Sequence, residues 1–194
     1  MERRELLKAI AALTGTAMIG GTAILSGCTN GAAPAAGLTF SDSDIALMDE
    51  IGETILPRTD VPGAKDAEIG RFMERMVNNC YFPEDQQEFH RGLAEIRTRC
   101  ESEYGSSFLA MTPEQRKALL EQLEQEAREA PYRPLEDRRN QISGSHFYTM
   151  LKQLTLFGFF TSEAGATQAL RHIATPGRYD GCYPYEKGDR AWAT

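Results

Sequence analysis

The sequence predicts an all-α domain of about five or six helices, with an export signal and a lipid tether before it and an extended, irregular arm after it. Apolar residues recur every three or four positions through most of residues 41–174, which is the spacing of helices that bury one face. Proline and glycine separate these stretches, and none alternates polar and apolar residues for long enough to indicate a strand. With 41% hydrophobic and 25% charged residues, the composition is typical of one soluble globular domain.

Residues 1–27 are predicted to be an export signal rather than part of the fold. The basic residues Arg3, Arg4 and Lys8 precede a run from Ala9 to Leu25 that contains no charge. This run has about the length of a signal-peptide core with its flanks. A transmembrane anchor is the alternative, but the three glycines within the run disfavour a permanent membrane helix.

Two short motifs indicate a route of export. The sequence RRELLK resembles the twin-arginine pattern, although Glu2 stands where Ser or Thr is usual; the matching residues are Arg3, Arg4, Leu6, Leu7 and Lys8. The sequence LSGC resembles a bacterial lipobox, in which Cys28 is lipidated and becomes the first mature residue. An unmodified thiol is the alternative. Residues 29–38 are small and uncharged, which predicts a flexible tether over 28–40.

The helices expected within residues 41–174 follow from capping and breaking signals. Ser41 is a suitable N-cap for the first helix, and Pro57 ends it. The sequence TPEQ, which begins at Thr112, has the pattern of a capping box. We expect helices at about 42–55, along a stripe from Ile69 to Cys80, from Pro83 to about Tyr104, at about 113–130, at about 145–160 with Phe157 on the buried side, and from Thr161 or Ser162 to about Ile173. Connecting loops are expected at 57–65 and 131–144, and prolines and glycines predict the arm at 175–194.

Charge and motifs exclude several classes of function. A net charge of −7 argues against a nucleic-acid-binding protein, which would gather basic residues to neutralise phosphates. The sequence contains no phosphate-binding glycine motif, no HExxH and no CxxC. His90, His146 and His172 are expected on three different helices without metal-ligand spacing, so no metal site is predicted. The acidic residues of the first helix are interpreted as solvated surface near a helix N-terminus. We find no catalytic constellation and expect no cofactor in this chain.

Three cysteines remain once Cys28 is assigned to lipid. Cys80 and Cys100 are both expected on inward faces of neighbouring helices, which suggests a disulfide in an oxidising compartment. Two buried thiols that act as small hydrophobic residues are the alternative. Cys182 would then be left over.

Two longer stretches carry a resemblance to a known family. These are ETILPRTDVPGAKDAEIGRFMERMV at residues 53–77 and LKQLTLFGFFTSEAGATQALRHIATPGRYDGC at residues 151–182. Together they resemble the gluconate 2-dehydrogenase subunit 3 family, small accessory subunits of periplasmic FAD-dependent sugar and sugar-acid dehydrogenases. The resemblance spans about residues 47–182.

The resemblance implies a non-catalytic partner protein. In such systems a large flavoprotein of the glucose-methanol-choline (GMC) oxidoreductase type holds FAD and oxidises a sugar hydroxyl, and a haem-containing cytochrome c often accepts the electrons. The small subunit supports the folding of the flavoprotein and carries the twin-arginine signal for both, so we expect a bacterial periplasmic protein that lipid on Cys28 anchors to a membrane. A stand-alone envelope lipoprotein, acting as a binding or scaffold module, is the alternative.

The partner interface is predicted in the last part of the chain. Tyr, Trp and Arg are the usual anchors of well-packed interfaces, and an extended arm has little surface of its own to cover. The predicted contact residues are Phe159, Phe160, Arg178, Tyr179, Tyr183, Tyr185 and Trp192. The alternative is that the arm folds back over its own helices. The loop at 57–65 is a second candidate contact.

Overall fold

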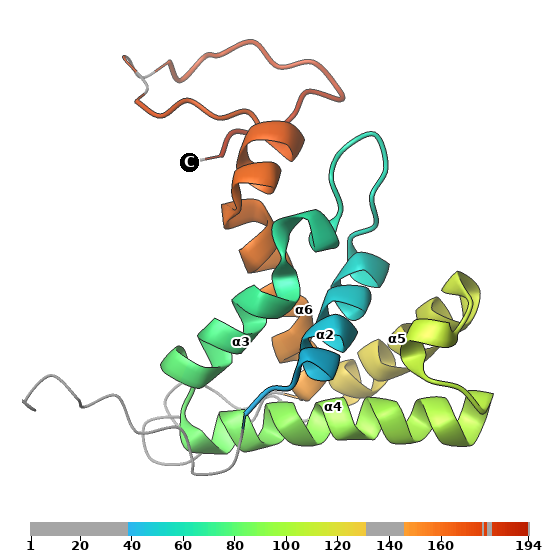
Figure 1. The fold of residues 1–194 in the computed structure, drawn as a ribbon. Coiled ribbons are helices and arrows are strands. Elements are labelled where there is room, and N and C mark those ends of the chain that lie inside the picture. Colours follow the sequence, from blue (N-terminus) through green and yellow to red (C-terminus); the bar gives the residue numbers. More distant parts are fainter. Residues whose placement is uncertain (1–38, 131–145, 176, 178–179, 194) are drawn as a thin grey trace, which may run out of the picture. The chain divides into compact units, whose positions relative to one another are not determined.

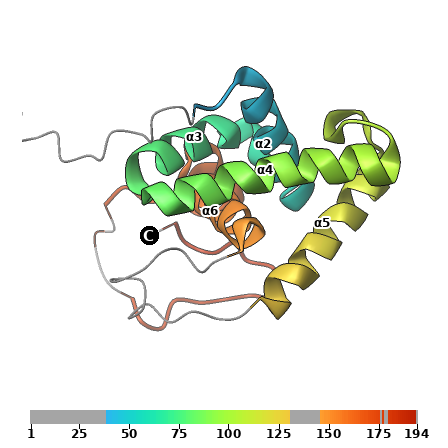
Figure 2. The same ribbon diagram turned by 90° about the horizontal axis from the view of Figure 1, so that it is seen from below.

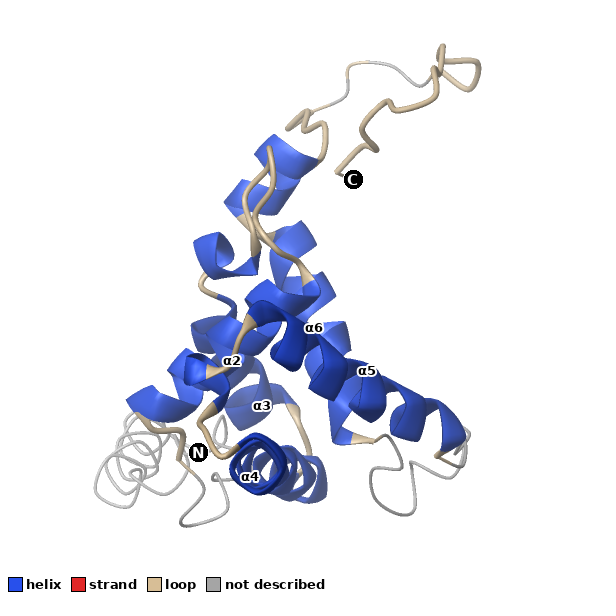
Figure 3. Cartoon of the chain, turned by 90° about the vertical axis from the view of Figure 1, so that its right-hand side faces the viewer, coloured by secondary structure: helices blue, strands red, loops and turns tan. Residues whose placement is uncertain are grey.

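The computed structural model describes residues 39–130, 146–175, 177 and 180–193 (Figure 1). The predicted export signal, Cys28 and the tether before Thr39 lie outside this part, as do the interface candidates Arg178 and Tyr179. The α-helices are α2 (Asp42–Ile55), α3 (Ile69–Cys80), α4 (Pro83–Tyr104), α5 (Pro113–Glu129) and α6 (Phe147–Thr161). Shorter elements are the 3₁₀ turns η2 (Ala64–Ala67) and η3 (Phe108–Ala110) and the π-helical turn η5 (Gly165–Ala169). No strand occurs in the part described, which confirms the all-α prediction (Figure 3).

Helix α6 is the element on which the other helices pack. It contacts α2, α3, α4 and α5, and α4 runs across the bundle when it is viewed from below (Figure 2). Its inward residues recur at helical spacing; they are Phe147, Tyr148, Met150, Leu151, Leu154, Thr155, Gly158 and Phe159. A helix with so wide an apolar face is stable only when neighbours cover it on several sides.

One close approach fixes the position of α6 against α4. The ring of Phe147, 1% exposed, lies against Gly92 of α4. A Cβ placed on Gly92 would stand 2.1 Å from Cγ of that ring. The absence of a side chain at Gly92 therefore lets the two helices meet.

The helix boundaries agree with the signals in the sequence. Ser41 Oγ accepts the N–H of Asp44 at 3.2 Å, and Asp44 Oδ2 accepts the N–H of Ser41 at 2.7 Å, which completes a capping box on α2. Thr112 and Gln115 form the same arrangement on α5. Because these signals act within one helical turn, they can be recognised in the sequence without knowledge of the tertiary structure.

The last expected helix differs most from its prediction. The chain leaves helical geometry after η5 ends at Ala169, so Ile173, expected on its buried face, is 48% exposed. A Cβ on Gly165 would stand 1.9 Å from the carbonyl oxygen of Phe159, so this turn requires glycine. Ser162 Oγ accepts the N–H of Gly165 at 3.0 Å and supports the turn. The tight turn at Gly165 and the end of helical geometry at Ala169 both depend on contacts that cannot be predicted from helical periodicity.

The predicted disulfide between Cys80 and Cys100 is wrong in this structure. Both are free thiols; Cys100 is buried as expected, but Cys80 is exposed at the end of α3. Cys80 lies just before Pro83, at the start of α4, whereas Cys100 lies near the other end of that helix. At 1.5 Å per residue the two positions are about 25 Å apart, far beyond the reach of a disulfide.

No helix within the residues described combines the length and apolar character needed to cross a bilayer.

Candidate interaction surface

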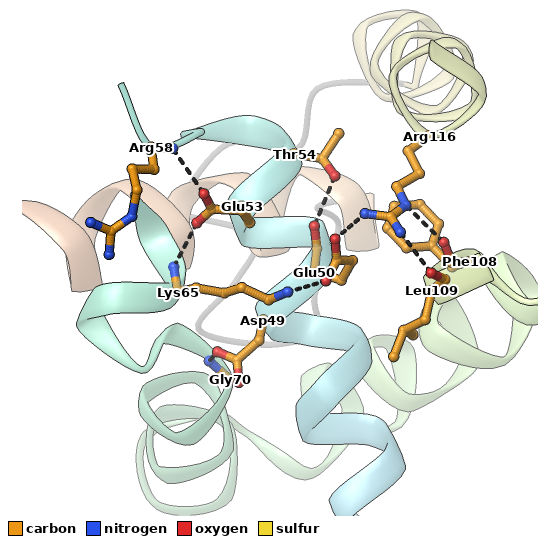
Figure 4. A network of polar contacts seen from close by, with 10 residues as sticks. All are labelled: Asp49, Glu50, Glu53, Thr54, Arg58, Lys65, Gly70, Phe108, Leu109 and Arg116. Carbon is orange, nitrogen blue, oxygen red and sulfur yellow. Dashed lines mark hydrogen bonds and ion pairs between the residues drawn. The ribbon is translucent and has the colours of Figure 1, made fainter. Parts of the chain in front are cut away.

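The loop after α2, residues 57–65, is held by a carboxylate of that helix. Glu53 accepts the backbone N–H of Arg58 at 2.8 Å through one oxygen and that of Lys65 at 3.0 Å through the other (Figure 4). Gly63 lies against the same carboxylate, because a Cβ there would stand 2.4 Å from Glu53 Oε2. The motif ILPRTDVPGAKDA thus folds around one acidic side chain that precedes it.

The far end of the loop is closed by Asp66. Its Oδ2 accepts the N–H of Gly63 at 2.8 Å, and its other oxygen pairs with the guanidinium of Arg58. Pro57 to Asp60 remain exposed at the tip. Bonds at both ends therefore hold a loop whose tip faces solvent.

Two further carboxylates of α2 connect this loop to the rest of the domain. Asp49 accepts the N–H of Gly70, at the start of α3, at 2.7 Å, and burial raises the pKa of Asp49. Glu50, with a side chain only 14% exposed, pairs with both Lys65 and Arg116. The expectation that the acids of the first helix are solvated surface is wrong for these residues, because elements far away in the sequence pack over them.

The outward face near the end of α6 carries two aromatic rings. Phe157 is 53% exposed and Phe160 is 40% exposed. Phe159 is 4% exposed and belongs to the core, so it offers little surface for the predicted contact with a partner. The predicted burial of Phe157 is wrong. The inward residues Met150, Leu154 and Gly158 place Phe157 at the border of the buried face of α6 rather than at its centre.

Gly158 provides the support for this outward face. A Cβ on Gly158 would stand 2.5 Å from Cδ1 of Phe72 on α3, so the ring of Phe72 lies directly over the glycine. Phe72 also contacts Phe157, with ring centroids 5.8 Å apart. The exposed Phe157 therefore rests on a ring from a neighbouring helix, which restricts its motion.

The 57–65 loop and the end of α6 belong to the same region of the domain. η2, which follows the loop directly, contacts α6. The loop and the C-terminal end of α6 lie side by side in both views (Figures 1 and 3). We use the name loop–α6 surface for residues 57–65 together with the exposed Phe157 and Phe160 near the end of α6.

The described part of the C-terminal arm turns back to the chain that leaves η5. Arg171 forms an isolated parallel bridge with Trp192. Tyr183, Tyr185 and Trp192 are 52%, 72% and 36% exposed, so all three candidates reach solvent.

Comparison with known proteins identifies the family. Residues 42–177 match the family model described as gluconate 2-dehydrogenase subunit 3. The chain belongs to the gluconate 2-dehydrogenase subunit 3 family. No match was found among curated proteins or among solved structures.

The family match covers most of the domain, including the 57–65 loop, α6 and η5. The description of the family names one subunit of a dehydrogenase, which supports an accessory subunit at the level of the family. The match ends at residue 177, before Tyr183, Tyr185 and Trp192.

The three histidines of this family member lie in three separate local environments. His146 caps α6 by accepting the N–H of Tyr148 at 3.2 Å, and His90 stacks on Phe40 with ring centroids 4.1 Å apart. His172 is exposed. Within the residues that the structure describes, no group of three His, Cys, Asp or Glu side chains could hold a metal ion.

The residues that sequence reasoning missed are Asp49, Glu50, Glu53 and Phe157. Helical spacing gives no clear signal for Phe157, because it follows the buried Met150 by seven positions, or nearly two full turns. No signal marks the carboxylates either, because acids in an amphipathic helix look alike until their partners are known.

Proposed function

We propose that this chain is the non-catalytic small subunit of a membrane-associated, FAD-dependent sugar, sugar-acid or glycoside dehydrogenase of the GMC type. The observation that carries the proposal is the family match over residues 42–177. In this proposal the chain helps its catalytic partner to fold, brings it through the twin-arginine route and holds it at a membrane through lipid on Cys28.

The loop–α6 surface is the part of the domain that we assign to the flavoprotein. Exposed aromatic rings that rest on packed neighbours are typical anchors of protein interfaces. Phe157 rests on Phe72, and the adjacent loop is held by Glu53 at its base. A surface that is ordered before binding loses less conformational entropy when the partner docks.

Chemistry is assigned to the partner in this proposal. The flavoprotein would hold FAD and oxidise a sugar hydroxyl, and a cytochrome c would take the electrons through its haem. FAD is inserted before export, so a loaded flavoprotein has to cross the membrane already folded. A twin-arginine signal carried by a small subunit meets that requirement, because this route accepts folded proteins.

Co-expression tests the proposal. A GMC-type flavoprotein that lacks its own signal is produced with and without this chain, and its FAD content, location and dehydrogenase activity are measured. We expect loaded, active flavoprotein outside the cytoplasm only when the chain is present. Equal FAD content, export and activity in both cases would refute the accessory role.

Two variants separate the parts of this role. Replacing Arg3 and Arg4 by Lys should retain the flavoprotein in the cytoplasm, and continued export would refute the carrier role. Cys28→Ala should release the complex from membranes without blocking export. Undiminished membrane retention of that variant would refute the lipid anchor.

A groove on another part of the domain favours the second candidate, a stand-alone envelope lipoprotein that binds a ligand. The groove has a volume of about 470 Å³, within the range of small-molecule sites. It is lined by Ser43, Ala46, Leu47, Arg97, Glu101, Ser107, Phe108 and Leu109. If the chain is exported as a monomer and no flavoprotein co-purifies with it, this second function would be favoured over the first.

A further inference from the structure

The C-terminal segment, residues 180–193, is joined to the end of the helical domain by main-chain hydrogen bonds. Arg171 donates its N–H to the carbonyl of Ala191 at 2.8 Å, and its own carbonyl accepts the N–H of Ala193 at 2.8 Å. The two bonds flank Trp192 and set its ring beside the side chain of Arg171. The last described residues thus return to a point about twenty positions earlier in the chain.

The guanidinium of Arg171 is held by two aromatic rings. Its Cζ lies 4.5 Å from the ring centroid of Trp192 and 5.6 Å from that of Tyr183. The two rings contact each other edge to face, with centroids 5.6 Å apart. A cation over the face of a tryptophan is attracted by the negative potential of the ring.

The environment of Arg171 provides few polar alternatives. Its Nε is buried and has no hydrogen-bond partner among the residues described. The carboxylate of Asp189 lies 3.9 Å from Nη1, at the limit of an ion pair. The rings of Tyr183 and Trp192 therefore flank a guanidinium whose Nε makes no hydrogen bond within the described residues.

A second arginine ties the segment to η5. Arg190 donates from Nη1 to the carbonyl of Gln168 at 2.6 Å. The last carbonyls of a helical turn have no partner within the turn, so an arginine from elsewhere satisfies this one. We call the group of Gln168, Arg171, Tyr183, Arg190 and Trp192 the C-terminal clasp.

The part of the segment between these ties has its own local order. Glu186 donates its N–H to Asp189 Oδ2 at 3.1 Å, and Asp189 donates its N–H to the carbonyl of Glu186 at 3.0 Å. Gly188 has a φ of 102°, a conformation that side chains disfavour, so glycine closes this turn. Tyr185 precedes the turn and is 72% exposed, the highest value among the exposed large hydrophobic side chains that the structure describes.

We propose that the C-terminal clasp closes residues 180–193 into a loop before any partner is present, and that the loop presents Tyr185 to the catalytic flavoprotein. The identity of the partner rests on the proposed function, whereas the clasp itself does not. Arg171 is a positioning residue, because it sets the loop and does not need to touch the partner. An exposed tyrosine on a closed loop offers contact area at a small entropic cost.

The single tryptophan of the chain makes the clasp measurable without a partner. Trp192 is the only tryptophan, so its emission and its quenching by acrylamide report directly on the clasp in the full chain. Arg171→Ala should shift the emission of Trp192 to longer wavelength. It should also increase about tenfold the fraction of molecules in which the clasp is open and Trp192 is accessible to acrylamide. Lys187→Ala is the matched control, since it removes one exposed cation of the same segment and leaves the clasp residues in place. Unchanged emission and quenching in Arg171→Ala, at unchanged helix content by circular dichroism, would refute the clasp.

Binding then tests the second half of the proposal. The probe is the FAD-loaded GMC-type flavoprotein from the co-expression experiment, titrated with the full chain in detergent. Tyr185→Ala should weaken binding about tenfold while the emission of Trp192 stays that of the original chain. Arg171→Ala should weaken binding through the opened loop, and Arg171→Lys should have a smaller effect on both readouts because it keeps the charge.

The possible outcomes are distinct. An opened clasp with undiminished binding would refute the role of the loop in recognition. Unchanged binding by Tyr185→Ala would refute the assignment of Tyr185 as a residue that contacts the flavoprotein. If the original chain does not bind the flavoprotein, the proposed function fails, and with it the recognition half of this proposal, while the emission of Trp192 still decides whether the clasp exists.

Discussion

Gly63 lies directly against the carboxylate of Glu53: a Cβ on the glycine would stand 2.4 Å from Oε2 and 2.5 Å from Oε1. The same two oxygens accept the N–H groups of Arg58 and Lys65, one on each side of the loop. The shape of the 57–65 loop thus depends on one carboxylate and on the absence of one side chain. Both belong to the sequence that marks the family.

Glu53→Gln should loosen this loop. An amide presents one oxygen and one NH₂ group, so one of the two backbone N–H groups of Arg58 and Lys65 would lose its acceptor. We expect a loss of about 1–3 kcal/mol in the free energy of unfolding, measured by urea denaturation, because bonds to charged acceptors are among the stronger ones. Amide hydrogen exchange at Arg58 and Lys65 should increase. Asp60→Asn, in the exposed tip of the same loop, is the control, and equal exchange in both variants would contradict the role of Glu53.

Gly63→Ala should destabilise the same loop from the other side. The new methyl group would collide with the Glu53 carboxylate and with the backbone nitrogen of Arg58, 2.6 Å from the Cβ position. We expect a loss of about 1–3 kcal/mol in unfolding free energy. Both substitutions disrupt the same contact. The double variant Glu53→Gln/Gly63→Ala should therefore lose less unfolding free energy than the sum of the losses in the two single variants. Strict additivity would show that the two residues act independently.

Arg116→Ala should destabilise the whole domain. The guanidinium pairs with Glu50, donates to the carbonyls of Phe108 at 2.9 Å and Leu109 at 2.7 Å, and lies over the ring of Phe108. Its removal would leave the shielded Glu50 carboxylate without this partner, so we expect a loss of about 3 kcal/mol by chemical denaturation.

The neighbouring Lys117 provides the control for Arg116. It pairs with Glu121 at 3.8 Å, and both side chains are more than 60% exposed. Lys117→Ala should therefore cost about 0.5 kcal/mol or less. Similar losses for the two variants would indicate that shielding from solvent does not decide the strength of these pairs.

His90 should make the stability depend on pH. Burial lowers the pKa of His90, although the charge of Asp44 partly opposes this, and the ring stacks on Phe40 while its Nε2 is buried without a partner among the residues described. The unfolded chain then binds a proton more readily than the folded chain. Stability is fully present above the unfolded pKa, near 6.5, and is lost as the pH falls from there through the lower folded pKa.

Denaturation midpoints between pH 8 and pH 5 test this, with about 6.5 as the reference value for histidine. His90→Gln should remove the part of the acid-side decline that the imidazole causes. His172→Gln, which removes an exposed histidine outside this stack, is the matched variant for comparison. A decline of the same steepness in His90→Gln would exclude His90 as its source.

Substitution by alanine should cost much more stability at Phe159 than at Phe157. Phe159→Ala removes a core ring and should cost about 3–5 kcal/mol in unfolding free energy. Phe157→Ala removes an exposed ring and should cost about 1 kcal/mol or less, through its contact with Phe72. If the loop–α6 surface binds the flavoprotein, Phe157→Ala should weaken that binding about tenfold or more. Undiminished binding would remove Phe157 from the interface.

The confirmed predictions come from signals that act over a few residues. The capping boxes at Ser41 and Thr112 and the proline at the start of α4 place helix ends through bonds within one turn. The error at Phe157 arose because this residue lies at the border of the buried face of α6, seven positions after the buried Met150, where periodicity alone does not decide exposure. Cys80 was assigned to the wrong face for a similar reason, since the last position of an amphipathic stripe often lies beyond the neighbour that covers the others.

The sequence by itself determined the helical class, the ends of most helices and, through two distinctive segments, the family. Tertiary structure alone decided which carboxylates of α2 are structural, that η2, directly after the 57–65 loop, contacts α6, and that Arg171 holds Trp192. The reason is physical: a cap or a stripe is encoded by neighbours along the chain, whereas Glu50 and Arg116, 66 residues apart, meet only because the helices between them pack in one arrangement. Identical side chains therefore acquire different roles according to what the fold places beside them.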